Sequence, residues 1–236
     1  RLYLEAADKN MIDKDEYPQT VAIETRCWRM LADLWHAPDP ANSIGTSTIG
    51  SSEACMLGGL ALKRRWQHAR RSAGEPTEKP NIVLSSAVQV CWEKFCNYFE
   101  VEPRYVPISE EHKVLDGHGL EKYVDENTIG VVAILGVTYT GMYEPVAAIA
   151  AALDRIQEAT GIDVPIHVDG ASGAMIAPFL QPDLEWEFRI ERVAQEERHL
   201  VAVWRQLGRI AHQHRDLLPV QQCSVQNMAA CTSGCT

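Results

Sequence analysis

The apolar positions of this chain change their period near residue 80, from helical spacing to short continuous runs. In 21–36 the apolar residues stand three or four positions apart, which predicts one stripe along a helix. The residues of this stripe are Ile23, Cys27, Met30, Leu31 and Leu34. Segment 52–71 is apolar at its start and basic at its end, as the dipole of a helix favours. The polar segments 38–42 and 73–80 contain proline and predict loops.

From residue 80 onward, β-rich runs alternate with helical stretches. The predicted strands are 81–85, 104–108, 129–137 and 164–168. The predicted helices between them are 88–99, 119–125 and 145–159. The run 129–137 is apolar throughout, as expected of a strand that is buried on both faces. This order predicts an α/β fold with a mainly parallel sheet and helices on both faces, and ligands are expected at the carboxyl ends of its strands.

Composition and charge exclude some classes of function and indicate the compartment of the protein. The net charge of -10 argues against a nucleic-acid binder, which usually carries a basic patch. No apolar run reaches the roughly 20 residues of a membrane helix, and no secretory signal opens the chain, so we expect a cytoplasmic protein. The seven cysteines are odd in number and fit a reducing compartment. Cys231 and Cys235, with His212 and His214 upstream, match no strong zinc pattern, so no metal site is predicted.

Three segments place polar side chains where such a sheet collects ligands. Ser51 and Ser52 stand at the start of a predicted helix, where unpaired N–H groups and the dipole favour a phosphate. Asp169 closes an apolar strand, where a carboxylate can keep a pyridine nitrogen protonated, as pyridoxal phosphate requires. Thr138 and Thr140 offer hydroxyls at the same edge. Each segment taken alone has a more common structural explanation. The serines can cap the helix, the aspartate can cap a turn, and threonine is an ordinary strand residue.

Taken together, the motifs resemble glutamate decarboxylases of the bacterial, plant and fungal type. The matching stretches are NMIDKDEYPQT, ADLWHAP, TIGSSEACMLGG, KPNIV, VQVCWEKFCNYFEVE, DENTIGVVAILGVTYTG, TGID and HVDGASGAMIAPF. The resemblance covers residues 1 to about 190. It implies the fold-type I pyridoxal-phosphate architecture, conversion of L-glutamate to γ-aminobutyrate and CO2, and a dimer or larger homo-oligomer. Residues 45–190 would be part of the cofactor-binding large domain, and 1–44 an incomplete N-terminal helical segment. Because the chain opens at Arg1 without a methionine, we expect further sequence before it.

The resemblance also implies roles for single residues. The implied cofactor-binding residues are Ser51, Ser52, Gln89, Thr138, Asp169 and Ala171. The three hydroxyl residues would hold the phosphate. Gln89 would lie against the pyridine ring, Ala171 would pack on its face, and Asp169 would pair with its nitrogen. Asn10 and Asp13 match positions that line the substrate pocket, and each is also an ordinary loop or cap residue.

The sequence departs from the family after residue 193. The family continues to a Ser-Gly-His-Lys motif whose lysine forms the Schiff base with the cofactor, but here His199 is followed by Leu200. All seven lysines stand at or before Lys122, so no catalytic residue is predicted. Because cofactor capture and product release depend on that lysine, we expect this chain alone to be inactive. Residues 191–236 are predicted to be a divergent tail, with a helix over 191–212 and disorder beyond it.

Two other functions are open to such a chain. It could be a non-catalytic partner that associates with full-length decarboxylase subunits. Its tail could also present a basic amphipathic helix around Trp204 to a calmodulin-like partner. The arginines of that helix are Arg198, Arg205, Arg209 and Arg215. The acidic residues beside them, Glu196, Glu197 and Asp216, dilute the positive charge and make this partner the least favoured interpretation.

Overall fold

The computed structural model describes residue 4, residues 7–10 and residues 12–193. The chain separates into two units, Arg1–Arg198 and His199–Thr236, and every described residue belongs to the first. Three sequence predictions therefore lie outside the described residues. These are the tail helix beyond residue 193 with the disorder after it, the calmodulin-like segment, and the cysteines and histidines of 212–235.

Four parallel strands form the sheet, as the alternating pattern predicts. They are β1 (Asn81–Ser85), β2 (Glu102–Val106), β3 (Thr128–Ile134) and β4 (Ile166–Asp169), in the order β2-β1-β3-β4. Every residue of β1 and β3 is buried, which explains their continuous apolar runs. β3 ends three residues earlier than predicted, because the chain turns at Gly136 with φ +104.

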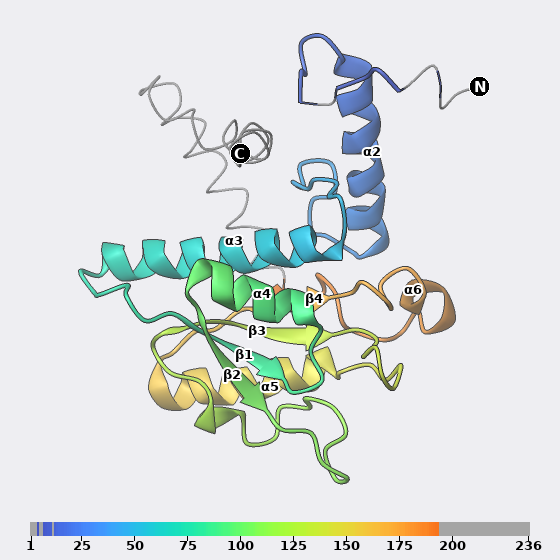
Figure 1. Ribbon diagram of the computed structural model, residues 1–236. Helices are drawn as coiled ribbons and strands as arrows, with labels where there is room; N and C mark the ends of the chain where they lie inside the picture. Colours follow the sequence, from blue (N-terminus) through green and yellow to red (C-terminus); the bar gives the residue numbers. More distant parts are fainter. Residues whose placement is uncertain (1–3, 5–6, 11, 194–236) are drawn as a thin grey trace, which may run out of the picture. The chain divides into compact units, whose positions relative to one another are not determined.

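Helices cover both faces of this sheet (Figure 1). α3 (Ser51–Ser72) and α4 (Val90–Phe99) lie on one face, and α5 (Val146–Thr160) lies on the other. The helix α5 buries an apolar stripe three or four residues apart, which is the spacing of one helical face. The buried residues of this stripe are Val146, Ile149, Ala150, Leu153 and Ile156. The predicted α/β class with a mainly parallel sheet and helices on both faces is confirmed.

One local prediction is wrong. The predicted helix 119–125 is only a 3-10 turn, η1 (Leu120–Lys122), because Gly119 before it has a φ of +66 and Asp125 after it is held in a turn. The helix predicted over 21–36 is confirmed as α2 (Pro18–Leu34), and part of its apolar stripe is exposed. Ile23 is 54% exposed and Met30 is 65% exposed, and Ala32 is the buried residue of this helix.

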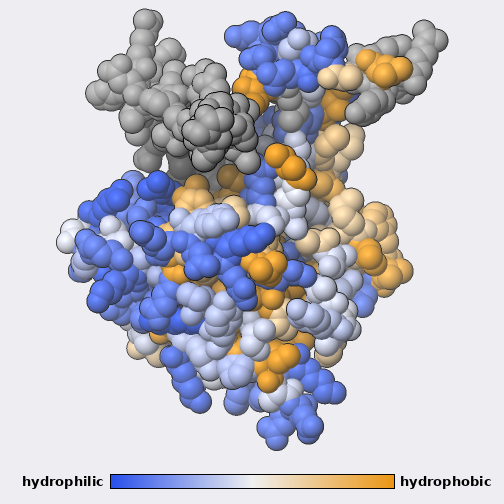
Figure 2. Space-filling model, viewed as in Figure 1, coloured by the Kyte–Doolittle hydropathy of each residue, from blue (hydrophilic) through white to orange (hydrophobic). Residues whose placement is uncertain are grey.

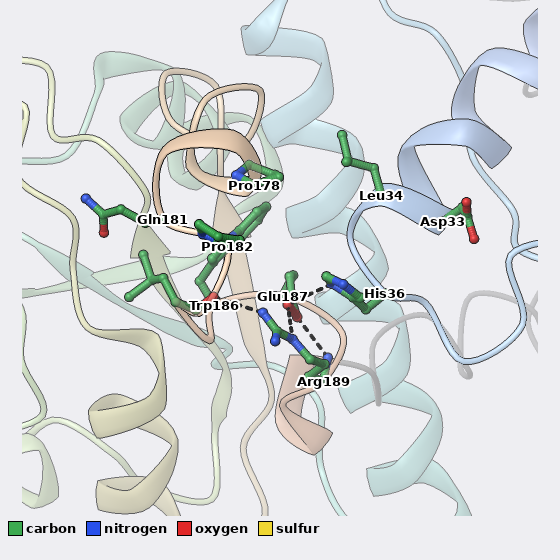
Figure 3. Close-up of a pocket in the computed structure, with 10 residues that line it drawn as sticks. Asp33, Leu34, His36, Pro178, Gln181, Pro182, Trp186, Glu187 and Arg189 are labelled. Atoms are coloured by element: carbon green, nitrogen blue, oxygen red, sulfur yellow. Dashed lines mark hydrogen bonds and ion pairs between the residues drawn. The ribbon is translucent and has the colours of Figure 1, made fainter.

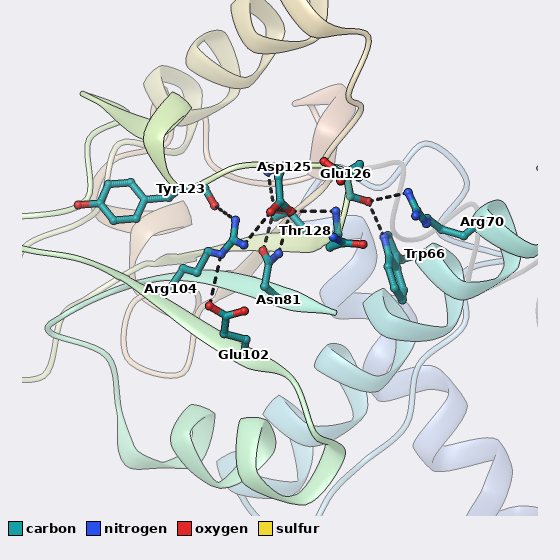
Figure 4. A network of polar contacts seen from close by, with 10 residues as sticks. Trp66, Arg70, Asn81, Glu102, Arg104, Tyr123, Asp125, Glu126 and Thr128 are labelled. Carbon is teal, nitrogen blue, oxygen red and sulfur yellow. Dashed lines mark hydrogen bonds and ion pairs between the residues drawn. The ribbon is translucent and has the colours of Figure 1, made fainter. Parts of the chain in front are cut away.

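A polar network closes the sheet at the amino ends of β1 and β3 (Figure 4). Asn81 Nδ2 donates to Asp125 Oδ1 at 2.8 Å, and Thr128 Oγ1 donates to Asn81 Oδ1 at 2.8 Å. Arg104 Nη2 donates to Asp125 Oδ2 at 2.7 Å. Burial acts to raise the pKa of the Asp125 carboxyl, but the hydrogen bonds from Asn81 and Arg104 outweigh it and lower that pKa. The polar side chains at the amino end of the sheet thus bond to one another. Ligands of such a sheet are expected at the carboxyl ends of its strands.

Apolar surface gathers on the side of the molecule where the short helix α6 (Ala177–Leu180) lies (Figures 1 and 2). The large exposed apolar residues in and just before α6 are Met175, Ile176, Phe179 and Leu180. Among the described helices, none combines the length and apolar character that crossing a bilayer requires.

Candidate functional site

The carboxyl edge of the sheet is centred on Asp169, the last residue of β4. Its Oδ2 accepts a hydrogen bond from Trp92 Nε1 at 2.9 Å and one from Cys55 Sγ at 3.8 Å. Its Oδ1 accepts from the backbone N–H of Ala171 at 3.2 Å. Three donors from α4, α3 and the loop after β4 therefore hold the carboxylate in one orientation.

Gln89 and Thr138 meet at the same edge. Gln89 lies between β1 and α4, and Thr138 follows β3. Gln89 Nε2 donates to Thr138 Oγ1 at 2.9 Å, and both residues are exposed. Residues 49 positions apart in the sequence are thus neighbours because their parallel strands end side by side.

The start of α3 lies one helical turn from Cys55, which contacts Asp169. Its N-cap is Gly50, in extended conformation, and no side chain caps the first N–H groups. Within the described part of the chain, the hydroxyls of Ser51 and Ser52 make no hydrogen bond. A Cβ at Gly50 would meet nothing within 4 Å, so the helix start opens onto free space. This arrangement suits an anion at the helix N-terminus.

The predicted site residues divide into two groups. Ser51, Ser52, Gln89, Thr138, Asp169 and Ala171 all lie on elements that meet at this edge. The structure does not bring Asn10 and Asp13 to it. These two are exposed and bond to each other, with Asn10 Nδ2 donating to Asp13 Oδ2 at 2.8 Å.

Sequence reasoning missed the residues that support Asp169. Trp92 is fully buried between Phe95 and His167, with ring centroids 5.9 and 5.2 Å away, and its indole N–H reaches the carboxylate. Cys55 stands four residues after Ser51, a spacing that places both on one face of α3. That spacing is a signal that the sequence contained.

A pocket of about 300 Å³ lies away from this edge, between the end of α2 and segment 178–189 (Figure 3). Three of the polar residues that line it bond to one another. Glu187 Oε1 accepts from the Arg189 guanidinium and lies 3.1 Å from His36 Nδ1, and Glu187 Oε2 accepts from the Arg189 N–H. These contacts join α2 to the later segment, and we interpret them as structural.

The comparisons with known proteins agree with this geometry. The conserved-domain profile of pyridoxal-dependent decarboxylases matches residues 2–219. The chain belongs to the pyridoxal-dependent decarboxylase family. It is similar to the glutamate decarboxylase of Aliivibrio fischeri, with 54% identity over 193 residues, which are 82% of this chain and 41% of that protein. It is also similar to the glutamate decarboxylase of Lactococcus lactis, with 49% identity over 195 residues, which are 82% of this chain and 42% of that protein.

Solved structures extend the comparison. The glutamate decarboxylase of Lactobacillus brevis superposes with a TM-score of 0.76 at 47% identity, over 81% of this chain and 44% of that one. A sphingosine-1-phosphate lyase of Burkholderia pseudomallei, at 23% identity over 78% of this chain and 42% of that one, has a TM-score of 0.66 and shows the shared fold. The chain thus spans about two fifths of the length of the curated relatives it matches. The expected family, fold-type I architecture and pyridoxal-phosphate cofactor of the family are confirmed.

In this decarboxylase-family chain the carboxyl group of Glu144 is buried next to the end of β3. Glu144 is 1% exposed, and its two oxygens accept from the backbone N–H groups of Ile134 at 2.7 Å and Leu115 at 3.2 Å. Burial raises the pKa of Glu144 from 4.5 to about 7, and these hydrogen bonds oppose the rise. The negative charge of Asp169 adds to it.

We expect the stability of the fold to fall as pH rises between about 5 and 8. In that window folded Glu144 retains a proton that the unfolded chain has lost, so the unfolded state is favoured as pH increases, by on the order of 3 kcal/mol in total. Asp116 and Asp125, whose pKa values are lowered, titrate below this window. Urea unfolding at pH 5, 6, 7 and 8 measures the dependence. A Glu144→Gln chain should show a shallower slope, and equal slopes would contradict the assignment.

Proposed function

We propose that this chain forms the phosphate- and ring-binding part of a glutamate decarboxylase site. The arrangement of Asp169 carries the proposal. It is a carboxylate at the end of a parallel strand, it is oriented by three donors, and one of these donors, Cys55, stands one helical turn from an uncapped helix start. When bound, pyridoxal phosphate supplies an electron-accepting ring that makes loss of CO2 from an amino acid accessible.

The residues at this edge fit the parts of that cofactor. Ser51 and Ser52 have free hydroxyls beside free N–H groups, which suit three phosphate oxygens. Asp169 offers a negative charge that would keep a ring nitrogen protonated. Gln89 and Thr138 are hydrogen-bonded to each other at the same edge of the sheet and, being exposed, are accessible to a ligand. Ala171 is exposed beside the carboxylate and is small enough to pack under a flat ring.

The relatives support a proposal for the substrate of the complete protein. The similar proteins of Aliivibrio fischeri and Lactococcus lactis are glutamate decarboxylases, and we propose L-glutamate as the substrate of the complete protein. No lysine follows Lys122 in this chain, so we propose that it binds the cofactor reversibly and does not turn over by itself. We also predict that the complete protein forms a homo-oligomer. Pairing of this chain with full-length decarboxylase subunits is a second, untested prediction.

Pyridoxamine 5′-phosphate tests the proposed site, because its amine cannot form a Schiff base with surface lysines. We expect its fluorescence to report saturable binding to this chain, and we expect pyridoxamine without phosphate to bind far more weakly. Replacing both Ser51 and Ser52 by alanine should weaken binding roughly 10- to 100-fold, the range for lost hydrogen bonds to a charged group.

Ser72→Ala is the matched control, since Ser72 is an exposed serine at the opposite end of the same helix. This control should bind like the unaltered chain. Asp169→Asn should also weaken binding, because the amide cannot hold a proton on the ring nitrogen. Binding that is unchanged in the Ser51/Ser52 double variant would place the phosphate elsewhere. γ-Aminobutyrate formation by this chain, with a borohydride-reduced adduct at one lysine, would contradict the absence of turnover.

A further inference from the structure

Two buried thiols and the Asp169 carboxylate converge beneath the candidate site. Cys91 Sγ lies 3.5 Å from Cys55 Sγ, and Cys55 Sγ lies 3.8 Å from Asp169 Oδ2. The three ligand atoms all lie within 4.8 Å of one another. They come from three separate elements, α3, α4 and β4, so packing of the helices on the sheet creates the group. We propose that Cys55, Cys91 and Asp169 bind one thiophilic divalent cation, Zn²⁺ in the first instance.

The geometry is close to that of a tetrahedral site. With zinc–sulfur bonds of about 2.3 Å, tetrahedral ligand atoms stand about 3.8 Å apart. Two of the three separations, 3.5 and 3.8 Å, are already near that value, and the third is at most 4.8 Å. Two sulfurs and one carboxylate are a donor set that zinc accepts, and three protein ligands leave a fourth position for water or another ligand.

The surroundings also suit a bound cation. Trp92 Nε1 donates to the same Oδ2 that would bind the metal, and such outer contacts orient metal ligands. Burial and the nearby Asp169 charge raise the pKa of the Cys55 thiol, so without a cation the thiol stays protonated. On binding, each thiol loses its proton to solvent, and the cation offsets two of the three negative charges of the two thiolates and the carboxylate.

Ordinary core packing is the alternative, because buried cysteines often act as small apolar residues. Cys96 shows what that alternative looks like. It is buried on the same helix α4 as Cys91, and burial raises its pKa to about 12, but it does not belong to the converging group. Cys96 is therefore a matched control for Cys91.

Cation and cofactor would compete, because both need the Asp169 carboxylate. This consequence rests on the proposed function, whereas the metal site itself does not. Zn²⁺ would then lower the affinity of the chain for pyridoxamine 5′-phosphate, and the competition would disappear when Cys91 is replaced.

The test uses the full chain under reducing conditions, with Cys223, Cys231 and Cys235 replaced by serine so that the tail contributes no thiolate. Cd²⁺ is titrated while its ultraviolet thiolate charge-transfer band is followed, and Zn²⁺ is then used to displace it. We expect one ion per chain. Cys55→Ala and Cys91→Ala should each weaken binding roughly 100-fold or more, beyond the 10- to 100-fold cost of losing an outer contact. Cys96→Ala should bind normally.

Equal binding by Cys91→Ala, or equal loss with Cys96→Ala, would overturn the proposal. X-ray absorption at the zinc edge of the tail-serine chain keeps the test valid if a cysteine variant fails to fold. Two sulfur neighbours at about 2.3 Å support the site, and no bound zinc or any other sulfur number overturns it. Pyridoxamine 5′-phosphate binding by Cys91→Ala separates the two proposals, because loss of metal with retained cofactor binding leaves the proposed function intact. In the chain that retains Cys55 and Cys91, metal binding without cofactor binding would refute the proposed function alone.

Discussion

Replacing Trp92 with alanine is expected to lower the free energy of unfolding by about 3–5 kcal/mol, the usual cost of removing a large buried aromatic side chain. Trp92 is 0% exposed, packs edge-on against Phe95 and His167, and fills the space between α4 and β4. Urea unfolding followed by circular dichroism measures the loss.

Trp92→Phe separates packing from hydrogen bonding. It retains most of the apolar contact but removes the indole N–H that donates to Asp169 Oδ2, so we expect a smaller loss of about 1–2 kcal/mol. Pyridoxamine 5′-phosphate binding should weaken in this variant more than its stability loss suggests, because Asp169 loses one of its three orienting donors. A Trp92→Ala chain as stable as the unaltered one would show that α4 does not pack as described.

Replacing Gly173 with alanine is expected to destabilise the fold by about 3 kcal/mol, which corresponds to a fall in Tm of roughly 6–12 °C for a chain of this size. A Cβ at Gly173 would lie 2.4 Å from the carbonyl oxygen of Leu135 and 3.0 Å from its carbonyl carbon. Those are backbone atoms at the end of β3, so relief requires the loop after β4 or the strand end to move.

Gly50→Ala is the matched control. Gly50 has a φ of -176, which any residue adopts, and its Cβ would meet nothing within 4 Å. Because alanine is a poorer N-cap than glycine, the unfolding free energy of this variant should fall by about 1 kcal/mol or less, well below the loss at Gly173. Gly173 lies in the loop that directly follows Asp169. Gly173→Ala should therefore also weaken pyridoxamine 5′-phosphate binding. Thermal unfolding of the two variants side by side measures the difference, and a similar Tm for both would refute the close approach.

The sequence by itself determined the strands and most of the helices. The apolar runs of β1 and β3 and the helical spacing of α5 are local patterns, and a segment buried on both faces or on one face must carry them. The alternation of these segments determined that the strands are parallel and that Thr138 and Asp169 come to one edge. The motifs in their order determined the family.

Only the tertiary structure decided what surrounds those residues. Spacing along the chain predicted an apolar stripe on α2 but not that Ile23 and Met30 would be exposed, because burial depends on which elements pack there. A local helical pattern at 119–125 was overridden by a glycine in left-handed conformation. The contacts of Asp169 with Trp92 and Cys55 join residues 77 and 114 positions apart. Such contacts arise when α3 and α4 pack side by side on one face of the sheet, and no period within either helix encodes their relative position.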